Sequence, residues 1–170
     1  TIDAIQYIRD GKIGEVKLVR GLCYKNRDSI GIADGTQAPP KSADYDIWVG
    51  PAPMKALGRK QFHYDWHWFW DYGNGDLGNQ GIHQMDIARW ALNKNTLPKS
   101  VLSLGGRFGY KDDGQTPNTE LCFFDYGDCE LIFEVRGLHK ETPNYRGARV
   151  GNVFHGSEGY VVLTSYTAGA

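Results

Sequence analysis

The sequence predicts an α+β domain, with an open, mostly antiparallel β-sheet and helices on one of its faces. Five strand-like runs follow one another after residue 100, with no helical pattern between them. A stretch with helical spacing precedes them at residues 79–92. The length of 170 residues suits a single domain, and the hydrophobic content of 41% is enough to form a core.

The chain should begin with a helix and a strand. Ile2, Ile5 and Ile8 recur at helical spacing, and Gly11 stands where a helix would end. Alternating apolar residues over 16–24 predict a half-buried strand. Residues 26–61 then show no period and contain four prolines, which indicates a long loop of the kind that often carries function.

The second half predicts a run of strands joined by tight turns. The run FFDYGDCELIF has a Tyr-Gly turn between two apolar stretches, and HGSEGY indicates a second turn. Strands joined by short turns pair antiparallel, so the sheet should be largely antiparallel. The predicted strands are 100–108, 119–125, 129–137, 150–155 and 160–164.

Composition excludes several classes of partner. A net charge of -1 provides no field to attract nucleic acid or an anionic membrane. No apolar run is long enough to cross a bilayer. Three cysteines without a C-x-x-C motif indicate buried thiols rather than a disulfide framework.

A glycine-rich stretch, GNGDLGNQGIHQMDIARW, has the form of a dinucleotide-binding fingerprint, since Gly73, Gly75 and Gly78 fit G-x-G-x-x-G. A true fingerprint follows a buried apolar strand, and an acidic residue closes the next strand. Here the aromatic segment HYDWHWFWDY comes first, and the next predicted strand, VLSLGGRF, has no acid. We therefore interpret the match as accidental.

The helix after these glycines carries polar groups suited to catalysis. Asn79 and His83 are four residues apart and should share one helix face. Asp86 follows three residues later and could fix the tautomer of the imidazole. The alternative is a satisfied core histidine, because His83 continues an apolar stripe with Ile87 and Trp90.

The aromatic segment before the glycines suggests a site for a sugar. Aromatic faces match the C–H faces of a sugar ring, and polar side chains match its hydroxyl groups. Tyr64 and His67 are the preferred substrate contacts, together with Trp68, although some of these rings should be core anchors. We interpret Arg59 and Lys60 as a solvated charge pair.

Two other classes of function remain open at this point. A metal-dependent hydrolase could use His63 and His67, four residues apart, with Asp71 and His83 nearby. That set needs a helix, which the sequence HYDWHWFW favours only weakly. The other class is a non-catalytic module for carbohydrate binding or assembly.

Several segments resemble the Gfo/Idh/MocA oxidoreductases. GNGDLGNQGIHQMDIARW resembles the family segment G-G-x-L-x-D-x-G-x-H-x-x-D, and YDIWVGPAP resembles its W-x-G-P-A-P element. IRDGKIGEVKLVRG resembles the helix and first strand that follow the cofactor domain, and FHGSEGYVVL resembles a late strand turn. The resemblance covers nearly the whole chain, and the first two elements together are specific.

The resemblance implies that residues 1–170 form a substrate-binding and oligomerisation domain. A Rossmann domain, which carries an E-K-P lysine, should lie upstream and hold most of an NAD or NADP cofactor. We then expect this chain alone to be inactive and the whole protein to form a homo-oligomer through the sheet. The expected location is the cytoplasm, or the periplasm where an export signal precedes the chain.

The resemblance also implies roles for individual residues. His83 matches the acid/base histidine, which takes a proton from a substrate hydroxyl as hydride leaves the same carbon. Asn79 stands where many members carry Asp; its amide can orient a hydroxyl but cannot accept the proton. Asp76 is an additional acid, either a helix N-cap or a substrate contact, and Asp86 is a further candidate contact. The implied substrate is a sugar, cyclitol or related polyol, with an NAD-dependent glycosidase as the alternative.

Overall fold

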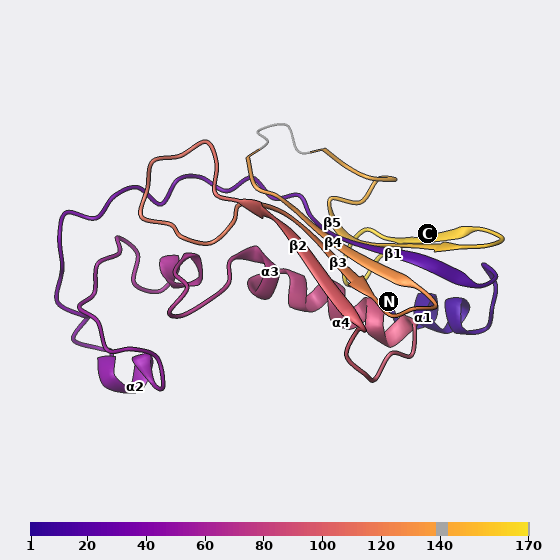
Figure 1. The fold of residues 1–170 in the computed structure, drawn as a ribbon, viewed down its shortest axis with the longest axis horizontal. Coiled ribbons are helices and arrows are strands. Elements are labelled where there is room, and N and C mark those ends of the chain that lie inside the picture. Colours follow the sequence, from indigo (N-terminus) through magenta and orange to yellow (C-terminus); the bar gives the residue numbers. More distant parts are fainter. Residues whose placement is uncertain (139–142, 170) are drawn as a thin grey trace.

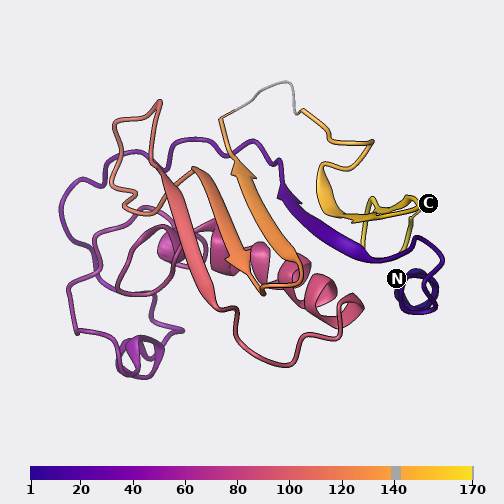
Figure 2. The same ribbon diagram turned by 45° about the vertical axis from the view of Figure 1, so that its right-hand side comes forward.

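The chain forms one six-stranded sheet with the strand order β2-β3-β4-β1-β5-β6 (Figure 2). The computed structural model describes residues 1–138 and 143–169. The strands are β1 (Val16–Cys23), β2 (Ser100–Gly106), β3 (Thr119–Asp125), β4 (Glu130–Arg136), β5 (Val150–Gly156) and β6 (Tyr160–Leu163). Neighbouring strands are antiparallel except for β1 and β4, which are parallel. The predicted fold class and all six predicted strands are confirmed.

Both predicted tight turns are present. Between β3 and β4, the Tyr126 amide donates to the Cys129 carbonyl at 3.1 Å, and Gly127 has φ +90°. Between β5 and β6, the Gly156 amide donates to the Gly159 carbonyl at 2.8 Å. The φ of Gly127 lies where only glycine is free of strain, which explains the residue at that turn.

The two longest helices, α1 (Ile2–Arg9) and α4 (Gly81–Ala91), lie on the same face of the sheet (Figure 1). The main core forms between these helices and the sheet, and its fully buried members include Val19, Ala88 and Phe154. A Cβ on Gly81 would lie 2.8 Å from the Phe133 ring, so this glycine lets α4 approach β4 closely. No helix in the described ranges is long and apolar enough to cross a membrane.

The predicted helix over 79–92 is divided in two. A short helix, α3 (Asp76–Asn79), ends at Asn79, and α4 begins at Gly81, so that Gln80 separates the two helices. Gly78 and Gly81 flank the division, and each glycine costs about 1 kcal/mol of helix stability relative to alanine. Local propensity therefore favours a break at the point where the sequence pattern predicts continuity.

Residues 26–72, here called the arm, extend away from the sheet between the end of β1 and α3 (Figures 1 and 2). The arm contains two short helices, α2 (Tyr45–Val49) and the 3₁₀-helix η1 (Asp65–Trp68). It also contains an isolated bridge between Gln37 and Leu57. The predicted loop is thus ordered, although most of it is irregular.

Arg59 lies inside the arm, and the interpretation of it as a solvated charge is wrong. Its side chain is only 3% exposed, and its guanidinium lies 4.4 Å from the centre of the Trp48 ring. The Phe62 carbonyl accepts hydrogen bonds from its Nε and Nη2 at 3.2 Å. Aromatic faces and a carbonyl replace water around the charge, which is why the arginine is stable there. Lys60 is exposed, as expected.

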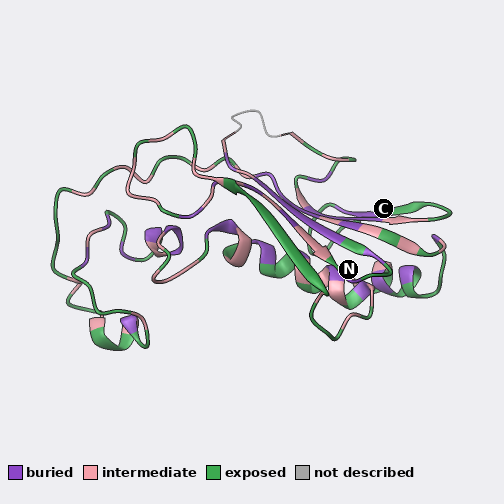
Figure 3. Cartoon of the chain, viewed as in Figure 1, coloured by how far each residue is buried: buried purple, intermediate pink, exposed green. Residues whose placement is uncertain are grey.

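The face of the sheet opposite α4 is partly uncovered. Leu102 and Leu104 of β2 are 57% and 62% exposed, and the whole strand is the most exposed of the sheet (Figure 3). Leu121 and Phe123 lie beside them on β3 and are half-buried. An apolar surface of this kind favours contact with another protein surface.

Candidate functional site

A dinucleotide fingerprint would have to follow a strand. The glycine-rich stretch instead follows η1 and a turn. A Cβ on Gly73 would lie 2.7 Å from the His67 Cα atom. A Cβ on Gly75, which has φ +67°, would lie 2.9 Å from Thr116 Oγ1. These glycines therefore allow close packing within the chain and do not form a cradle for phosphate groups.

Asp76 forms a buried ion pair with Arg27. Arg27 donates from Nε to Asp76 Oδ2 at 2.8 Å and from Nη2 to Asp76 Oδ1 at 2.6 Å. The Asp76 side chain has no exposed surface, and that of Arg27 is 14% exposed. Burial lowers the pKa of Arg27, but the hydrogen bond and charge of Asp76 outweigh it and raise that pKa above its ordinary value. Gly75 occupies the N-cap of α3, so Asp76 fastens the start of the arm to this helix instead of capping it.

His67, on η1, is buried with one ring nitrogen unpaired. Its Nδ1 lies 2.7 Å from the Tyr64 carbonyl, which can only accept a hydrogen bond, so Nδ1 carries the proton. Its Nε2 is then an acceptor and has no hydrogen-bond partner within the described ranges. Burial lowers the pKa of His67, so the ring stays neutral near neutral pH. A buried free acceptor is costly, which makes this nitrogen a candidate contact for a hydroxyl group.

His67 and Asn79 line the same pocket, which has a volume of about 260 Å³. One residue comes from the arm and the other from α3. Rings from the arm and the three motif glycines complete the walls. Its lining residues are Trp66, His67, Tyr72, Gly73, Asn74, Gly75, Gly78 and Asn79.

Tyr64 and Trp68 lie on another side of η1. Trp68 is only 2% exposed, and the guanidinium groups of Arg27 and Arg107 lie 5.9 Å and 5.1 Å from its ring centre. Tyr64 is exposed, and its hydroxyl accepts a hydrogen bond from Arg27 Nη1 at 2.7 Å. Both residues line a separate pocket of about 250 Å³ beside Arg27. Trp68 is therefore an anchor for the arm.

His83 lies on the first turn of α4 and is exposed, so it is not a core histidine. Its ring centre lies 5.2 Å from that of Tyr166. Asn79 is exposed at the end of α3, one turn before it. No hydrogen bond joins His83 to Asp86 in the described part of the chain.

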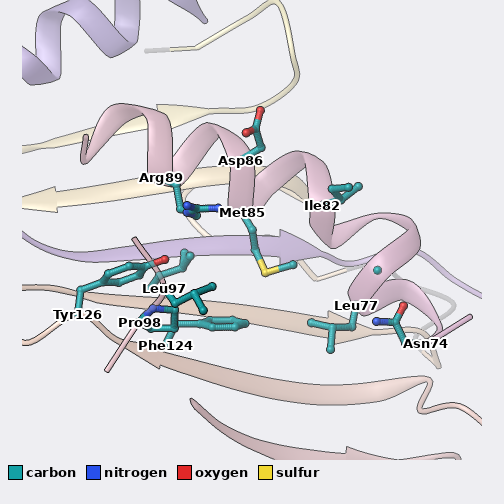
Figure 4. A pocket seen from close by; sticks show the side chains of 12 residues that line it. Asn74, Leu77, Ile82, Met85, Asp86, Arg89, Leu97, Pro98, Phe124 and Tyr126 are labelled. Carbon is teal, nitrogen blue, oxygen red and sulfur yellow. The ribbon is translucent and has the colours of Figure 1, made fainter. Parts of the chain in front are cut away.

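Asp86 borders an apolar groove of about 610 Å³ between α4 and the strands β3 and β4. Leu77, Met85, Leu97 and Phe124 are among its walls (Figure 4). The carboxylate of Asp86 points away from these apolar side chains (Figure 4). The structure thus places Asp86 apart from the pocket of His67 and Asn79.

Among the residues that the structure describes, neither a cluster of metal ligands nor a reactive thiol is present. His63 is exposed whereas His67 is buried, and no cluster of three or more potential metal ligands occurs among residues 1–138 and 143–169. All three cysteines are free and buried. Burial raises the pKa of the Cys23 and Cys122 thiols to about 12, which leaves them un-ionised and poorly nucleophilic.

The sequence pattern did not single out Arg27, Tyr72 and Gln80 as parts of this region, whereas Trp66 belongs to the aromatic segment that it did indicate. Gln80 accepts a hydrogen bond from the Lys25 ammonium and donates one to the Tyr166 hydroxyl. Arg27 stands alone in a stretch without a period, far from Asp76 in the sequence. Only the aromatic density of residues 62–72 could have drawn attention to Tyr72.

Comparison with known proteins agrees with this architecture. Residues 17–162 match the Gfo/Idh/MocA model described as "Oxidoreductase family, C-terminal alpha/beta domain". No curated protein matches the chain.

Several solved structures share the fold. GenD2 from gentamicin A biosynthesis, in complex with NAD, gives a TM-score of 0.58 at 16% identity, covering 95% of this chain and 35% of that one. The WlbA dehydrogenase from Bordetella pertussis, in complex with NADH and UDP-GlcNAcA, gives 0.58 at 15% identity, covering 99% and 40%. Levoglucosan dehydrogenase, in complex with NADH and levoglucosan, gives 0.59 at 16% identity, covering 94% and 36%.

At these identities the likeness concerns the fold. The chain spans between 35% and 40% of the length of these three proteins. The family model matches residues 17–162, which is most of the chain and includes all residues that line the pocket of His67 and Asn79. The chain belongs to the Gfo/Idh/MocA oxidoreductase family and corresponds to its C-terminal α/β domain.

Proposed function

We propose that this chain is the substrate-binding half of an NAD(P)-dependent oxidoreductase that acts on a sugar, cyclitol or related polyol. The observation that carries the proposal is the pocket in which His67 and Asn79 lie beside Trp66 and Tyr72. Its rings suit the C–H faces of a polyol, and its polar side chains suit the hydroxyl groups. Structurally related proteins bound to NADH and levoglucosan or UDP-GlcNAcA support the same class of substrate.

The residues would divide the work of binding. The unpaired Nε2 of His67 accepts a hydrogen bond from a substrate hydroxyl, and the Asn79 amide orients a second hydroxyl. Tyr64 offers a further polar contact at the separate pocket beside Arg27. Asp76 and Trp68 act indirectly, because they hold Arg27 and thereby the arm.

His83 is our candidate for the acid/base residue, as the family resemblance implies. It is exposed on α4 next to the end of α3, where a substrate held at Asn79 could reach its imidazole. The imidazole would take the proton of the reacting hydroxyl. A nicotinamide held by an upstream Rossmann domain would accept the hydride, since the motif glycines here form no phosphate site.

The test is His83→Ala in the full-length enzyme, measured as nicotinamide reduction with a panel of sugars and polyols. Loss of general base catalysis should lower kcat by about 10²- to 10⁴-fold and change KM little. His63→Ala is the matched control, because His63 is an exposed histidine of the arm. Turnover equal to that of the wild type would remove His83 from the mechanism.

A second candidate function is an NAD-dependent glycosidase of the same family. Asn79 favours it, because an amide at this position cannot serve as a second proton acceptor. Cleavage of a glycoside without net formation of reduced cofactor would identify this activity. Net formation of reduced cofactor in proportion to product would identify a dehydrogenase.

The uncovered face of the sheet supports a homo-oligomer. Leu102, Leu104, Leu121 and Phe123 form its apolar part, and two of these leucines are more than half exposed. Burial of this surface against a second copy would stabilise the assembly. Light scattering of the full-length protein that gives a monomer at high concentration would refute this part of the proposal.

A further inference from the structure

Trp66 and Tyr72 line a second pocket as well as the one that contains His67. The second pocket has a volume of about 400 Å³. It lies against the W-V-G-P-A-P segment at residues 48–53, which the proposed function leaves without a role. Its lining residues are Trp48, Val49, Pro51, Ala52, Trp66, Asp71 and Tyr72.

The rings of the second pocket are held firmly in place. The Trp48 and Tyr72 ring centres are 5.0 Å apart at an interplanar angle of 61°. The buried Arg59 guanidinium lies 4.4 Å from the Trp48 ring centre and 5.4 Å from that of Tyr72. A ring that does not need to be ordered on binding costs little entropy, so these rings are prepared for a ligand.

Asp71 provides the polar group of the second pocket. Its carboxylate lies 2.6 Å from Lys55 Nζ, and the two side chains are 26% and 59% exposed, respectively. An ion pair this exposed contributes little energy. A ligand hydroxyl can therefore donate a hydrogen bond to the Asp71 carboxylate, either together with the lysine or in its place. Aromatic rings beside a carboxylate are again the groups that recognise a sugar.

The volumes of the two pockets also favour one ligand that extends across both. The first pocket, about 260 Å³, is smaller than the roughly 300–1,000 Å³ of most small-molecule sites. The second pocket, about 400 Å³, lies within that range by itself, and the two together leave room for a ligand larger than one ring. The shared residues Trp66 and Tyr72 place the two pockets side by side, so one ligand could occupy both.

We propose that the substrate has two sugar rings, with the reacting ring in the His67–Asn79 pocket and a second ring in the Trp48–Asp71 pocket. This inference rests on the proposed function and narrows its substrate class from any polyol to disaccharides and related glycosides. The second ring stacks on the aromatic wall, and one of its hydroxyl groups donates a hydrogen bond to Asp71.

The experiment measures nicotinamide reduction by the full-length enzyme with matched pairs of sugars, such as glucose and cellobiose or galactose and lactose. The quantity of interest is kcat/KM for the disaccharide divided by kcat/KM for the monosaccharide. This ratio cancels any general loss of folded enzyme. A hydrogen bond to a charged group together with ring stacking should make the wild-type ratio about 10 or more for at least one pair.

Two variants test the second pocket. Ala52→Trp fills it with a bulky side chain and should bring the ratio to about 1, since only the second ring is excluded. Asp71→Asn removes the charge and should lower the ratio about tenfold. Lys55→Gln is the control for the ion pair and should change the ratio less than about twofold.

The outcomes separate the two proposals. Oxidation of monosaccharides and disaccharides with equal kcat/KM refutes the two-ring substrate and leaves the proposed function intact. If both variants leave a high ratio unchanged, the second ring does not occupy the Trp48–Asp71 pocket, which also refutes this inference and leaves the proposed function intact. No oxidation of any sugar or polyol would refute the proposed function and this inference together.

Discussion

The sheet and the arm are held together by different forces, although they belong to one chain. In the sheet, backbone hydrogen bonds run between six strands, and apolar side chains such as Val19 and Phe154 are fully buried against α1 and α4. In the arm, the helices α2 and η1 are both short, so backbone hydrogen bonds within helices contribute little. The buried residues of the arm include charged and polar ones.

In the arm, arginine side chains hold the structure together, as apolar side chains do in the sheet. Arg59 lies among the rings of Trp48, Phe62 and Tyr72, and Arg27 joins the beginning of the arm to Asp76. Such contacts depend on direction and on exclusion of water, whereas apolar packing does not depend on direction. The pocket is therefore built on the part of the molecule whose order depends on a few specific side chains.

A single substitution in each region should affect stability by a different amount and over a different part of the chain. Phe133→Ala removes a fully buried ring beneath α4 and should lower the free energy of unfolding by about 3–5 kcal/mol. Arg59→Met keeps an apolar stem but removes the charge and should cost about 2 kcal/mol, mostly within the arm. Hydrogen exchange measured by mass spectrometry on the full-length protein reports both changes.

Phe133→Ala should accelerate exchange throughout the strands, and Arg59→Met should accelerate it at residues 37–72 while the strands keep their protection. Arg59→Lys is the control, since it retains a cation without the planar group that stacks on rings. Equal loss of protection in the sheet for Arg59→Met would show that the arm and the sheet unfold as one unit.

A smaller effect concerns two histidines, the buried His67 in the arm and the half-buried His155 in the sheet. Burial lowers the pKa of both below the ordinary value of 6.5. Below that pH the unfolded chain binds protons that the folded chain does not, so stability is full above it and falls as the pH falls. His67→Gln and His155→Gln should each reduce the loss of Tm between about pH 7.5 and about pH 5.5.

For His67→Gln, the reduction should come with weaker sugar binding; for His155→Gln, it should not, because His155 lies outside the pocket of His67 and Asn79. A loss of Tm equal to that of the wild type in His67→Gln would mean that His67 has the same pKa in the folded and the unfolded protein, so that the folded ring takes up a second proton below about pH 6.5. Its Nε2 would then be a donor rather than the acceptor that the proposed contact requires.

The strands were predictable from the sequence because each has its own local pattern. The run ELIFEVR gives β4, and the turns at Gly127 and Gly156–Gly159 mark where strands reverse. The break at Gln80 was not predicted, since apolar spacing continues across it and only the flanking glycines oppose a continuous helix.

The sequence indicated the types of residue at the candidate site but not the contacts between them. The aromatic segment before the glycines drew attention to His67, which lines a pocket with Asn79. No spacing rule links Arg27 to Asp76, which lies 49 positions later. Arg59 was misjudged because arginine is seldom buried, and two of the rings that surround it, Trp48 and Tyr72, lie 11 and 13 positions away in an irregular stretch. Contacts between side chains in an irregular region leave no periodic signal in the sequence.

The position of β1 affects how the chain can fold during synthesis. This strand lies in the middle of the sheet, yet its parallel neighbour β4 pairs Leu18 with Glu130, and β5 comes later still. At roughly 5–20 residues per second, β1 leaves the ribosome on the order of 5–20 s before the first strand that can pair with it. During that time both edges of an apolar strand are unpaired, so slow folding and a need for protection from aggregation follow from the strand order itself.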